Sequence, residues 1–122
     1  MKPRSKVWIE KDGEVVAGDG KVRLLAMIDK LGSIQGAANK MGMSYRHAWG
    51  FIRKMEKHWG AKLVQTQIGG RKGGGAKLTL QGKDFLQRFF KFRDGLDEYI
   101  ADKFLMAFKN QGRVRDKRKA DC

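Results

Sequence analysis

Residues 33–60, SIQGAANKMGMSYRHAWGFIRKMEKHWG, decide the fold. Ser33 is a suitable N-cap for a first helix, and Gly42 is a suitable end for it. Ser44 then caps a second helix that runs to Trp59, so only three or four residues join the two helices. The short glycine-containing turn and the small alanines where the helices would cross predict a helix-turn-helix. The apolar face of the first helix comprises Ile34, Ala37, Ala38 and Met41.

The helix predicted from Ser44 to Trp59 has two chemically different faces. One is apolar: Ala48, Ile52, Met55 and Trp59. The other carries Arg46, Gly50, Arg53 and Lys57, flanked by His47 and Lys54. A helix in the major groove of DNA needs exposed hydrogen-bond donors, and arginine can bind guanine through two such bonds. A solvated basic face without a ligand is the alternative interpretation, and the basic segment that follows favours nucleic-acid binding.

The segment after this helix is predicted to be a β-hairpin with a basic tip. Residues 63–67 and 76–80 have the composition of strands, and GGRKGGG at 69–75 separates them. Arg71 and Lys72 in this glycine loop suit contacts with phosphate or with the minor groove. A phosphate-binding P-loop is rejected, because Ala76 stands where that motif requires lysine. A hairpin directly after a helix-turn-helix predicts a wing.

Two further elements are predicted before the helix-turn-helix. Residues 7–9 and 15–17 are β-prone, and the Asp12-Gly13 pair between them favours a tight hairpin turn. A helix is predicted at about residues 20–31, with Asp19 as its N-cap and Gly32 as its end.

A long final helix is predicted at about residues 81–108. Its aromatic residues provide more apolar surface than one packed face requires, so we expect a homodimer formed through this helix. The alternative is that both apolar faces are buried inside one small domain. The seven aromatic residues are Phe85, Phe89, Phe90, Phe92, Tyr99, Phe104 and Phe108.

The predicted fold class is therefore mainly α with small β-hairpins: a winged helix-turn-helix with a long C-terminal dimerisation helix. One domain is expected over residues 1–108. Residues 109–122 are charged and nearly free of apolar side chains, which predicts a basic disordered tail.

The amino-acid composition indicates what kind of partner the chain binds. The net charge is +14 and the isoelectric point is about 10.2, so a polyanionic partner is expected. The charge is concentrated, because residues 21–80 contain twelve Lys and Arg but only two Asp and Glu. By itself, this charge suits DNA, RNA or an anionic membrane. No apolar run reaches the length of a membrane span and the N-terminus has no signal-peptide pattern, which predicts a cytoplasmic protein with no membrane partner.

The sequence offers no constellation for catalysis or for metal binding. Its single cysteine, Cys122, excludes a disulfide within the chain and a cysteine-based metal site, and its role is open. His47 and His58 are separated by 11 positions without a matching carboxylate pattern, and His58 is expected to interact with the helix dipole. No catalytic residue, metal or cofactor is predicted.

The helix-turn-helix and the glycine loop also carry a family resemblance. Gly32-Ser33-Ile34, Ala37-Ala38, Met43-Ser44-Tyr45 with Ala48-Trp49, and the glycine loop with Leu78-Thr79 resemble the DNA-binding domain of molybdate-dependent (ModE-type) bacterial regulators. A more distant resemblance is to the N-terminal domain of LysR-type regulators. The resemblance implies a winged helix that dimerises through its long helix and places its third helix in the major groove.

One departure from the ModE-type pattern limits what the resemblance implies. Full-length members resemble two-part proteins with a C-terminal molybdate-binding region of small β-barrels. The tail from Lys109 is too short and too polar to form such a barrel, so molybdate sensing is not expected.

The functional hypothesis is sequence-specific binding of duplex DNA by a ModE-like transcriptional regulator that lacks the molybdate-sensing region. An RNA-associated or protein-interaction winged helix is the alternative. For Trp49, packing is favoured over recognition. The candidate DNA-binding residues are Ser33, Ser44, Tyr45, Arg46, His47, Gly50, Arg53, Lys54, Arg71 and Lys72.

Overall fold

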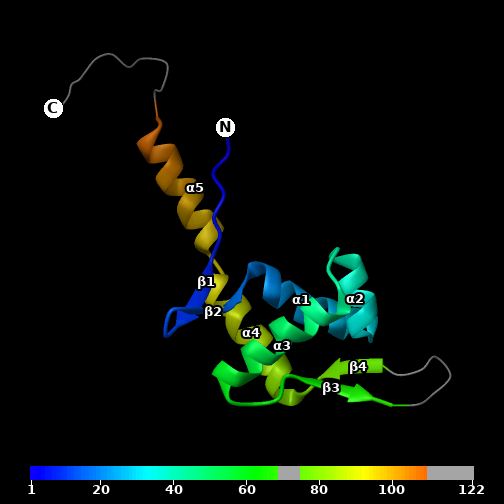
Figure 1. Cartoon of the computed structure of the whole chain (residues 1–122). Helices are drawn as coiled ribbons and strands as arrows, with labels where there is room; N and C mark the ends of the chain where they lie inside the picture. The colour runs from blue at the N-terminus through cyan, green and yellow to red at the C-terminus, as the bar shows by residue number, and fades with distance from the viewer. Residues whose placement is uncertain (69–74, 110–122) are drawn as a thin grey trace. The chain divides into compact units, whose positions relative to one another are not determined.

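The computed structural model describes residues 1–68 and 75–109 (Figure 1). The chain divides into two compact units, residues 6–93 and residues 1–5 together with the chain from residue 94 onward. The elements in chain order are β1 (Trp8–Lys11), β2 (Glu14–Gly18), α1 (Asp19–Leu31), α2 (Ile34–Lys40), α3 (Tyr45–Trp59), β3 (Val64–Gln67), β4 (Gly75–Leu78), α4 (Leu80–Arg93) and α5 (Leu96–Ala107).

Strands β1 and β2 form the predicted N-terminal hairpin. They pair in antiparallel fashion, with Lys11 opposite Glu14. The two residues between them, Asp12 and Gly13, have φ values of 52° and 79°. Positive φ at both positions of a two-residue turn matches the twist of the strands, and Asp-Gly tolerates it well. The predicted hairpin is therefore confirmed.

Helices α2 and α3 form the predicted helix-turn-helix, and serine side chains start both of them. Ser33 Oγ accepts a hydrogen bond from Gly36 N at 2.9 Å, and Ser44 Oγ accepts one from His47 N at 3.0 Å. These bonds satisfy backbone donors that have no partner inside the helix. In the turn, Gly42 has a φ of 70°, and Met43 N donates to the carbonyl of Ala38 at 2.9 Å.

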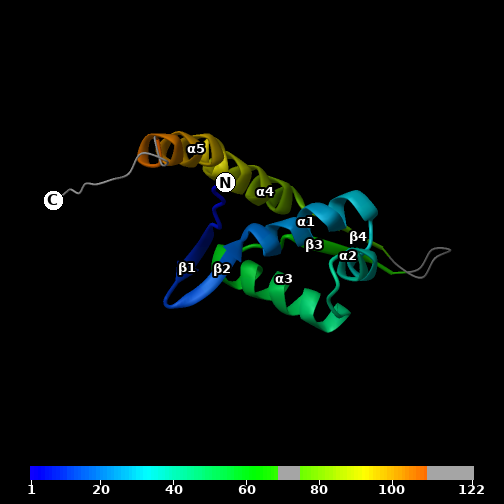
Figure 2. The ribbon, with the colours of Figure 1, turned by 90° about the horizontal axis from the view of Figure 1, so that it is seen from above.

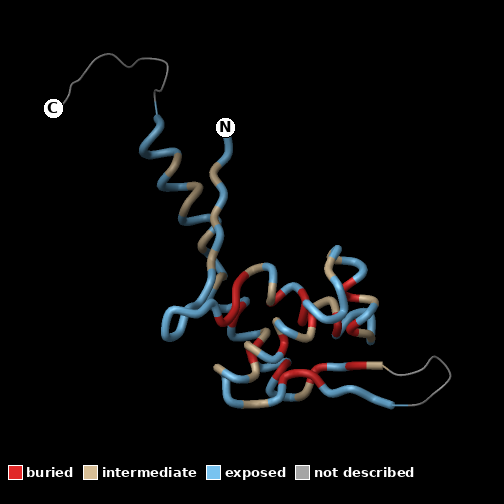
Figure 3. The backbone as a smooth tube through the Cα atoms, viewed as in Figure 1, coloured by how far each residue is buried: buried red, intermediate tan, exposed pale blue. Residues whose placement is uncertain are grey.

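The core of residues 6–93 lies where α1, α2 and α3 meet, with contributions from β2, the wing strands and α4 (Figure 3). Small side chains allow α2 and α3 to approach closely, because Ala37, Ala38 and Ala48 are all 0% exposed. The largest fully buried side chains are Leu24, Leu25, Ile28, Ile52, Met55, Leu63, Val22 and Val64.

Two expectations at helix ends were wrong in detail. The N-cap of α1 is Gly18, and Asp19 is instead the first helical residue. Its carboxylate accepts a hydrogen bond from Val7 N at 3.4 Å and forms an ion pair with Arg93 at 2.9 Å, so it binds neighbouring segments rather than its own helix. Trp59 was expected on the buried face of α3, but it is 43% exposed. Its ring forms an edge-to-face pair with the ring of Phe85.

The wing strands β3 and β4 pair in antiparallel fashion, as predicted, with Val64 opposite Leu78. Ala76 N donates to the carbonyl of Gly32 at 2.9 Å, which joins β4 to the end of α1. Leu80, expected in the second strand, is instead the first residue of α4. The loop that carries Arg71 and Lys72 lies outside the described residues.

The expected C-terminal helical segment is present as two consecutive helices, α4 and α5. Gly95 separates them because its φ of 82° is left-handed, a conformation that a continuous right-handed helix excludes. Helix α4 runs alongside α1 (Figure 2), whereas α5 contains no buried residue (Figure 3). None of the helices within residues 1–68 and 75–109 is long and apolar enough to cross a membrane. The predicted tail lies mostly outside the described residues.

Candidate nucleic-acid interface

The predicted recognition residues of α3 share one exposed face. Helix α3 is anchored from behind by Ala48, Ile52 and Met55, which are all 0% exposed. Because these apolar residues face the core, the other side of the helix is presented to solvent. Lys54 is half-buried there, and the exposed candidates are Ser44, Tyr45, Arg46, His47, Gly50 and Arg53.

Trp49 packs against the core and supports Arg53. The indole is half-buried and packs against the core, as predicted. The guanidinium carbon of Arg53 lies 5.2 Å from the centre of the Trp49 ring. The rings of Tyr45 and Trp49 form an edge-to-face pair, with their centroids 6.4 Å apart. A cation above an aromatic face is electrostatically favoured, so the Trp49 ring stabilises this placement of the exposed Arg53 side chain.

A second aromatic group on α3 was missed by the sequence reasoning. The ring of Phe51 stacks on His47, with centroids 5.9 Å apart. Lys21 Nζ from α1 lies 5.0 Å from the Phe51 ring centre. The i,i+4 spacing of His47 and Phe51 was a usable signal, but nothing in the sequence places Lys21 beside them.

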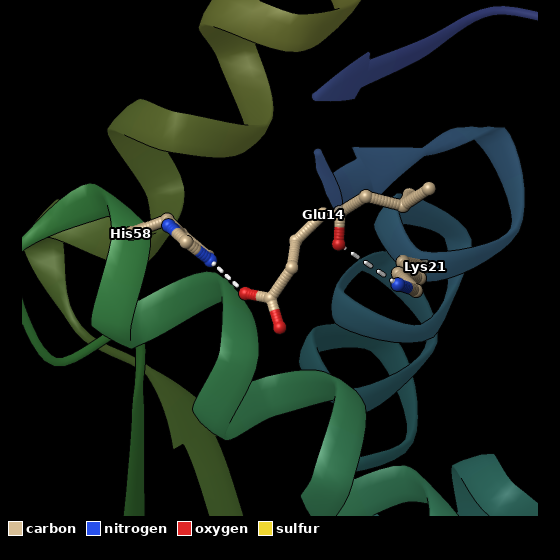
Figure 4. Close-up of polar contacts among 4 residues, drawn as sticks. Glu14, Lys21 and His58 are labelled. Carbon is tan, nitrogen blue, oxygen red and sulfur yellow. Dashed lines mark hydrogen bonds and ion pairs between the residues drawn. The ribbon is translucent and has the colours of Figure 1, made fainter. Parts of the chain in front are cut away.

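The N-terminal hairpin is fastened to the end of α3 by Glu14 and His58 (Figure 4). His58 Nε2 and Glu14 Oε1 are 2.7 Å apart, and the His58 side chain is only 8% exposed. The hydrogen bond with His58, and after it the positive charges of Lys54 and Lys57, hold the pKa of the Glu14 carboxyl below its usual value. His58 therefore has a specific partner in addition to its predicted position in the last turn of α3.

The cations beside this contact repel one another. Lys21 Nζ donates to the carbonyl of Val15 at 3.3 Å (Figure 4). Burial first, and the charge of Lys54 second, lower the pKa of Lys21 from its usual value. A bound anion would offset both effects, because an opposite charge nearby favours the charged form of the Lys21 ammonium group and weakens its repulsion by Lys54. Lys21 and Lys54 therefore place two interacting positive charges at this edge of α3.

The base of the wing is tied to α3 through Glu56. Its carboxylate accepts hydrogen bonds from Leu63 N at 2.9 Å and from Val64 N at 3.3 Å. The strand that starts the wing is thereby held at a fixed place relative to the last turns of α3. Glu56 was not a sequence candidate, because its partners are backbone groups.

Ser33 and Ser44 lie at the first turns of two different helices, α2 and α3. In both, the hydroxyl oxygen is occupied as a cap acceptor, while the hydroxyl hydrogen remains able to donate. Within the described residues, the structure therefore places the candidates on α3 together and Ser33 at the start of the neighbouring helix.

The segment that contains the helix-turn-helix and the wing matches a family of known proteins. Residues 20–83, more than half of the chain, match the family described as bacterial regulatory helix-turn-helix protein, lysR family. The chain belongs to this family. The LysR-type match covers α1, the helix-turn-helix, the wing and the start of α4, which are the elements that the sequence predicted to form the DNA-binding fold.

Curated relatives of this LysR-type chain confirm the predicted ModE-type resemblance. It is 33% identical to the molybdenum-pterin-binding protein MopB of Rhodobacter capsulatus, over 78% of this chain and 35% of MopB. It is 38% identical to the transcriptional regulator ModE of Haemophilus influenzae, over 57% of this chain and 27% of ModE. The chain thus spans about a third or less of the length of these two relatives.

A solved structure supports the fold. The DNA-binding domain of BenM, in its complex with benA site 1 DNA, aligns with a TM-score of 0.56. The identity is 21%, and the alignment covers 74% of this chain and 96% of the other. The winged helix-turn-helix class is confirmed by this likeness and by the family match.

Proposed function

We propose that this LysR-type chain binds duplex DNA in a sequence-specific manner and regulates transcription. The observation that carries the proposal is the exposed face of α3, where hydrogen-bond donors are gathered on a helix whose opposite face is buried in the core. Donors on a protruding helix suit the major groove, whose base edges offer a distinct acceptor pattern for each base pair. The relatives named as transcriptional regulators are in accord with this role.

The side chains divide into two proposed roles. Arg46 and Arg53 read base edges, and Tyr45 and His47 contact either bases or phosphates. Ser33, Ser44 and Lys54 bind phosphates and set the register of the helix in the groove. Arg71 and Lys72, which lie outside the described residues, are proposed from the sequence alone as phosphate or minor-groove contacts.

The proposed function is tested by selecting bound fragments from a random duplex library, with RNA as competitor. We expect a recurring DNA sequence to be recovered and RNA to compete poorly. About six phosphate contacts would give a slope near −5 for the logarithm of the binding constant against the logarithm of salt concentration. Preferential retention of RNA, or no retained nucleic acid at all, would favour the alternative of an RNA-associated or protein-interaction module.

The two proposed roles predict different mutational effects. Arg46→Ala or Arg53→Ala should reduce discrimination between the selected site and its variants by about 1–3 kcal/mol, because a bidentate contact with guanine is lost. Arg71→Ala and Lys72→Ala should weaken binding to all sequences alike. Arg23→Ala is a matched control that removes the same charge from an exposed position of α1. If Arg23→Ala relaxes specificity as much as the α3 substitutions, the base-reading role is wrong.

We also propose that the chain forms a homodimer through α4 and α5. Helix α5 is rich in apolar residues, yet within the described chain none of them is buried. Tyr99, Leu105 and Met106 are 61%, 65% and 74% exposed. Apolar surface left open in this way typically marks an interface, and a two-fold dimer would present two copies of α3 to paired half-sites. Residues 1–108 would then be a DNA-binding and dimerisation domain.

A further inference from the structure

The exposed face of α3 contains a notch at Gly50. Arg46, Gly50 and Lys54 are spaced by four, so they form one row along the helix. Gly50 leaves the middle of that row empty between two long cationic side chains. The resulting shallow depression is lined by Ser44, Arg46, His47, Gly50, Phe51 and Lys54.

The fold does not require glycine at this position. Gly50 lies inside a regular α-helix and has no positive φ, and an added Cβ would meet nothing within 4 Å. Glycine in an exposed helix interior destabilises the helix relative to alanine. Neither packing nor backbone conformation therefore explains the glycine at position 50, and the notch that it creates is a feature that a function could use.

One side of the depression is formed by the ring of Phe51, which has contacts of its own with His47 and Lys21. The Phe51 ring stacks on His47 with an interplanar angle of 29°, and Lys21 Nζ lies 5.0 Å from its centre. Phe51 is half-buried and packs against the core. A small apolar group that enters beside Gly50 would therefore meet a preformed aromatic surface with cations at the rim.

We propose that this notch receives the C5-methyl group of a thymine. The inference rests on the proposed function, since it requires α3 to lie in the major groove. The methyl group of thymine is the apolar group that the base edges present there, and phenylalanine is a suitable partner for it. Arg46, which the proposed function assigns to base reading, would donate from the rim to thymine O4, the acceptor next to the methyl group. A phosphate oxygen would be bound by the cations at the rim and would make no use of the Phe51 ring, whereas a methyl group beside Gly50 would pack on that ring.

The first test is a methyl scan of the selected duplex. Each thymine is replaced in turn by deoxyuridine, which removes the C5-methyl group and leaves base pairing unchanged. We expect one position per half-site at which the replacement weakens binding about fourfold, the effect of losing one buried methyl group. If no position responds, the proposal is overturned even though the duplex is bound.

The second test asks whether the thymine methyl group is read at Gly50. Gly50→Ala places its own methyl group in the notch, so the variant should bind the thymine duplex at least fourfold more weakly than the unaltered chain. It should lose the preference for thymine and bind the deoxyuridine duplex as well as or better than the thymine duplex, because only the thymine methyl group would meet the alanine Cβ. Its melting temperature should not fall, because the added Cβ has open space and alanine favours the helix.

Gly20→Ala is the matched control. It makes the same change at an exposed α1 position where an added Cβ also meets nothing within 4 Å, and it should retain the methyl preference. If Gly50→Ala discriminates between the two duplexes as the unaltered chain does, the methyl group is read elsewhere and the proposal is wrong. A library from which no duplex is recovered would instead contradict the proposed function.

Discussion

Gly82→Ala is expected to lower the free energy of unfolding by about 3 kcal/mol, the upper end of the range for overpacking a well-packed interior. Gly82 lies in the first turn of α4 and is buried against the end of the wing. A Cβ at this position would overlap the carbonyl oxygen of Leu63 and lie 3.2 Å from the Cβ of Leu78. The carbonyl is backbone, so a change of rotamer cannot relieve the overlap.

The backbone around Gly82 is fixed by several hydrogen bonds, which is why the effect should be large. The Leu63 carbonyl accepts from Thr79 N at 3.0 Å. Thr79 Oγ1 donates to the Lys62 carbonyl at 2.6 Å and accepts from Gly82 N at 2.9 Å. Moving α4 away from the clash would stretch these bonds and pull Leu63, which is 0% exposed, out of its core position.

Denaturant unfolding monitored by tryptophan fluorescence measures this effect. Gly20→Ala is again a suitable control, because it adds the same methyl group in open space and should leave the unfolding midpoint unchanged or slightly raised. The melting temperature of Gly82→Ala should fall by roughly 10 °C. If Gly82→Ala has the same unfolding midpoint as the control, the backbone around Gly82 and Leu63 can move to accept the methyl group, and the prediction is wrong.

The parts of the fold that sequence reasoning predicted correctly depend on local signals. Ser33 and Ser44 act as caps because their hydroxyls reach backbone donors three residues ahead. Gly32 and Gly60 end α1 and α3 in the left-handed conformation, with φ values of 73° and 85°. Such signals need only a few neighbouring residues, so they are readable without knowledge of the tertiary structure.

The features that were missed depend on residues distant in sequence. Glu14 meets His58 across 44 positions, and nothing near either residue indicates the other. The break at Gly95 was not predicted, because an isolated glycine is often tolerated inside a helix. Gly82 likewise looked like an ordinary helical residue, and its close approach to the backbone of Leu63 appears only in three dimensions.

For the candidate site, the amphipathic pattern of α3 correctly predicted which residues would be exposed together. The pattern could not predict which neighbouring side chains contact the exposed residues. Arg53 lies above Trp49, and Phe51 contacts both His47 and Lys21, because of ring orientations that depend on how α3 packs on α1 and the core. The DNA contacts themselves stay predictions, as do the roles of Arg71 and Lys72.

Replacing both Phe104 and Phe108 with glutamate is expected to convert the proposed dimer into a folded monomer that binds a palindromic site about 10²–10⁴-fold more weakly. The two rings pack on one another with centroids 5.0 Å apart, and Phe108 is 55% exposed. With Met1, Leu105, Met106 and Lys109 they line a largely apolar depression at the end of α5. In a dimer interface the two carboxylates would be removed from water into largely apolar surroundings, which is strongly unfavourable. The loss of binding follows because linked half-sites add avidity that a monomer lacks.

Folding and dimerisation can be separated in this experiment, because the two rings lie outside the core. Every buried core residue of the described chain lies within residues 6–93, so the glutamate variant should keep its helical content and still bind a single half-site. Phe104→Leu with Phe108→Leu keeps the surface apolar and should remain a dimer on sedimentation. The unaltered chain is the decisive sample: if it sediments as a monomer at micromolar concentration without DNA, the dimer proposal fails. A single α3 reading one half-site would then have to account for all of the specificity, since the second half-site, one helical turn or about 34 Å away, would have no helix to read it.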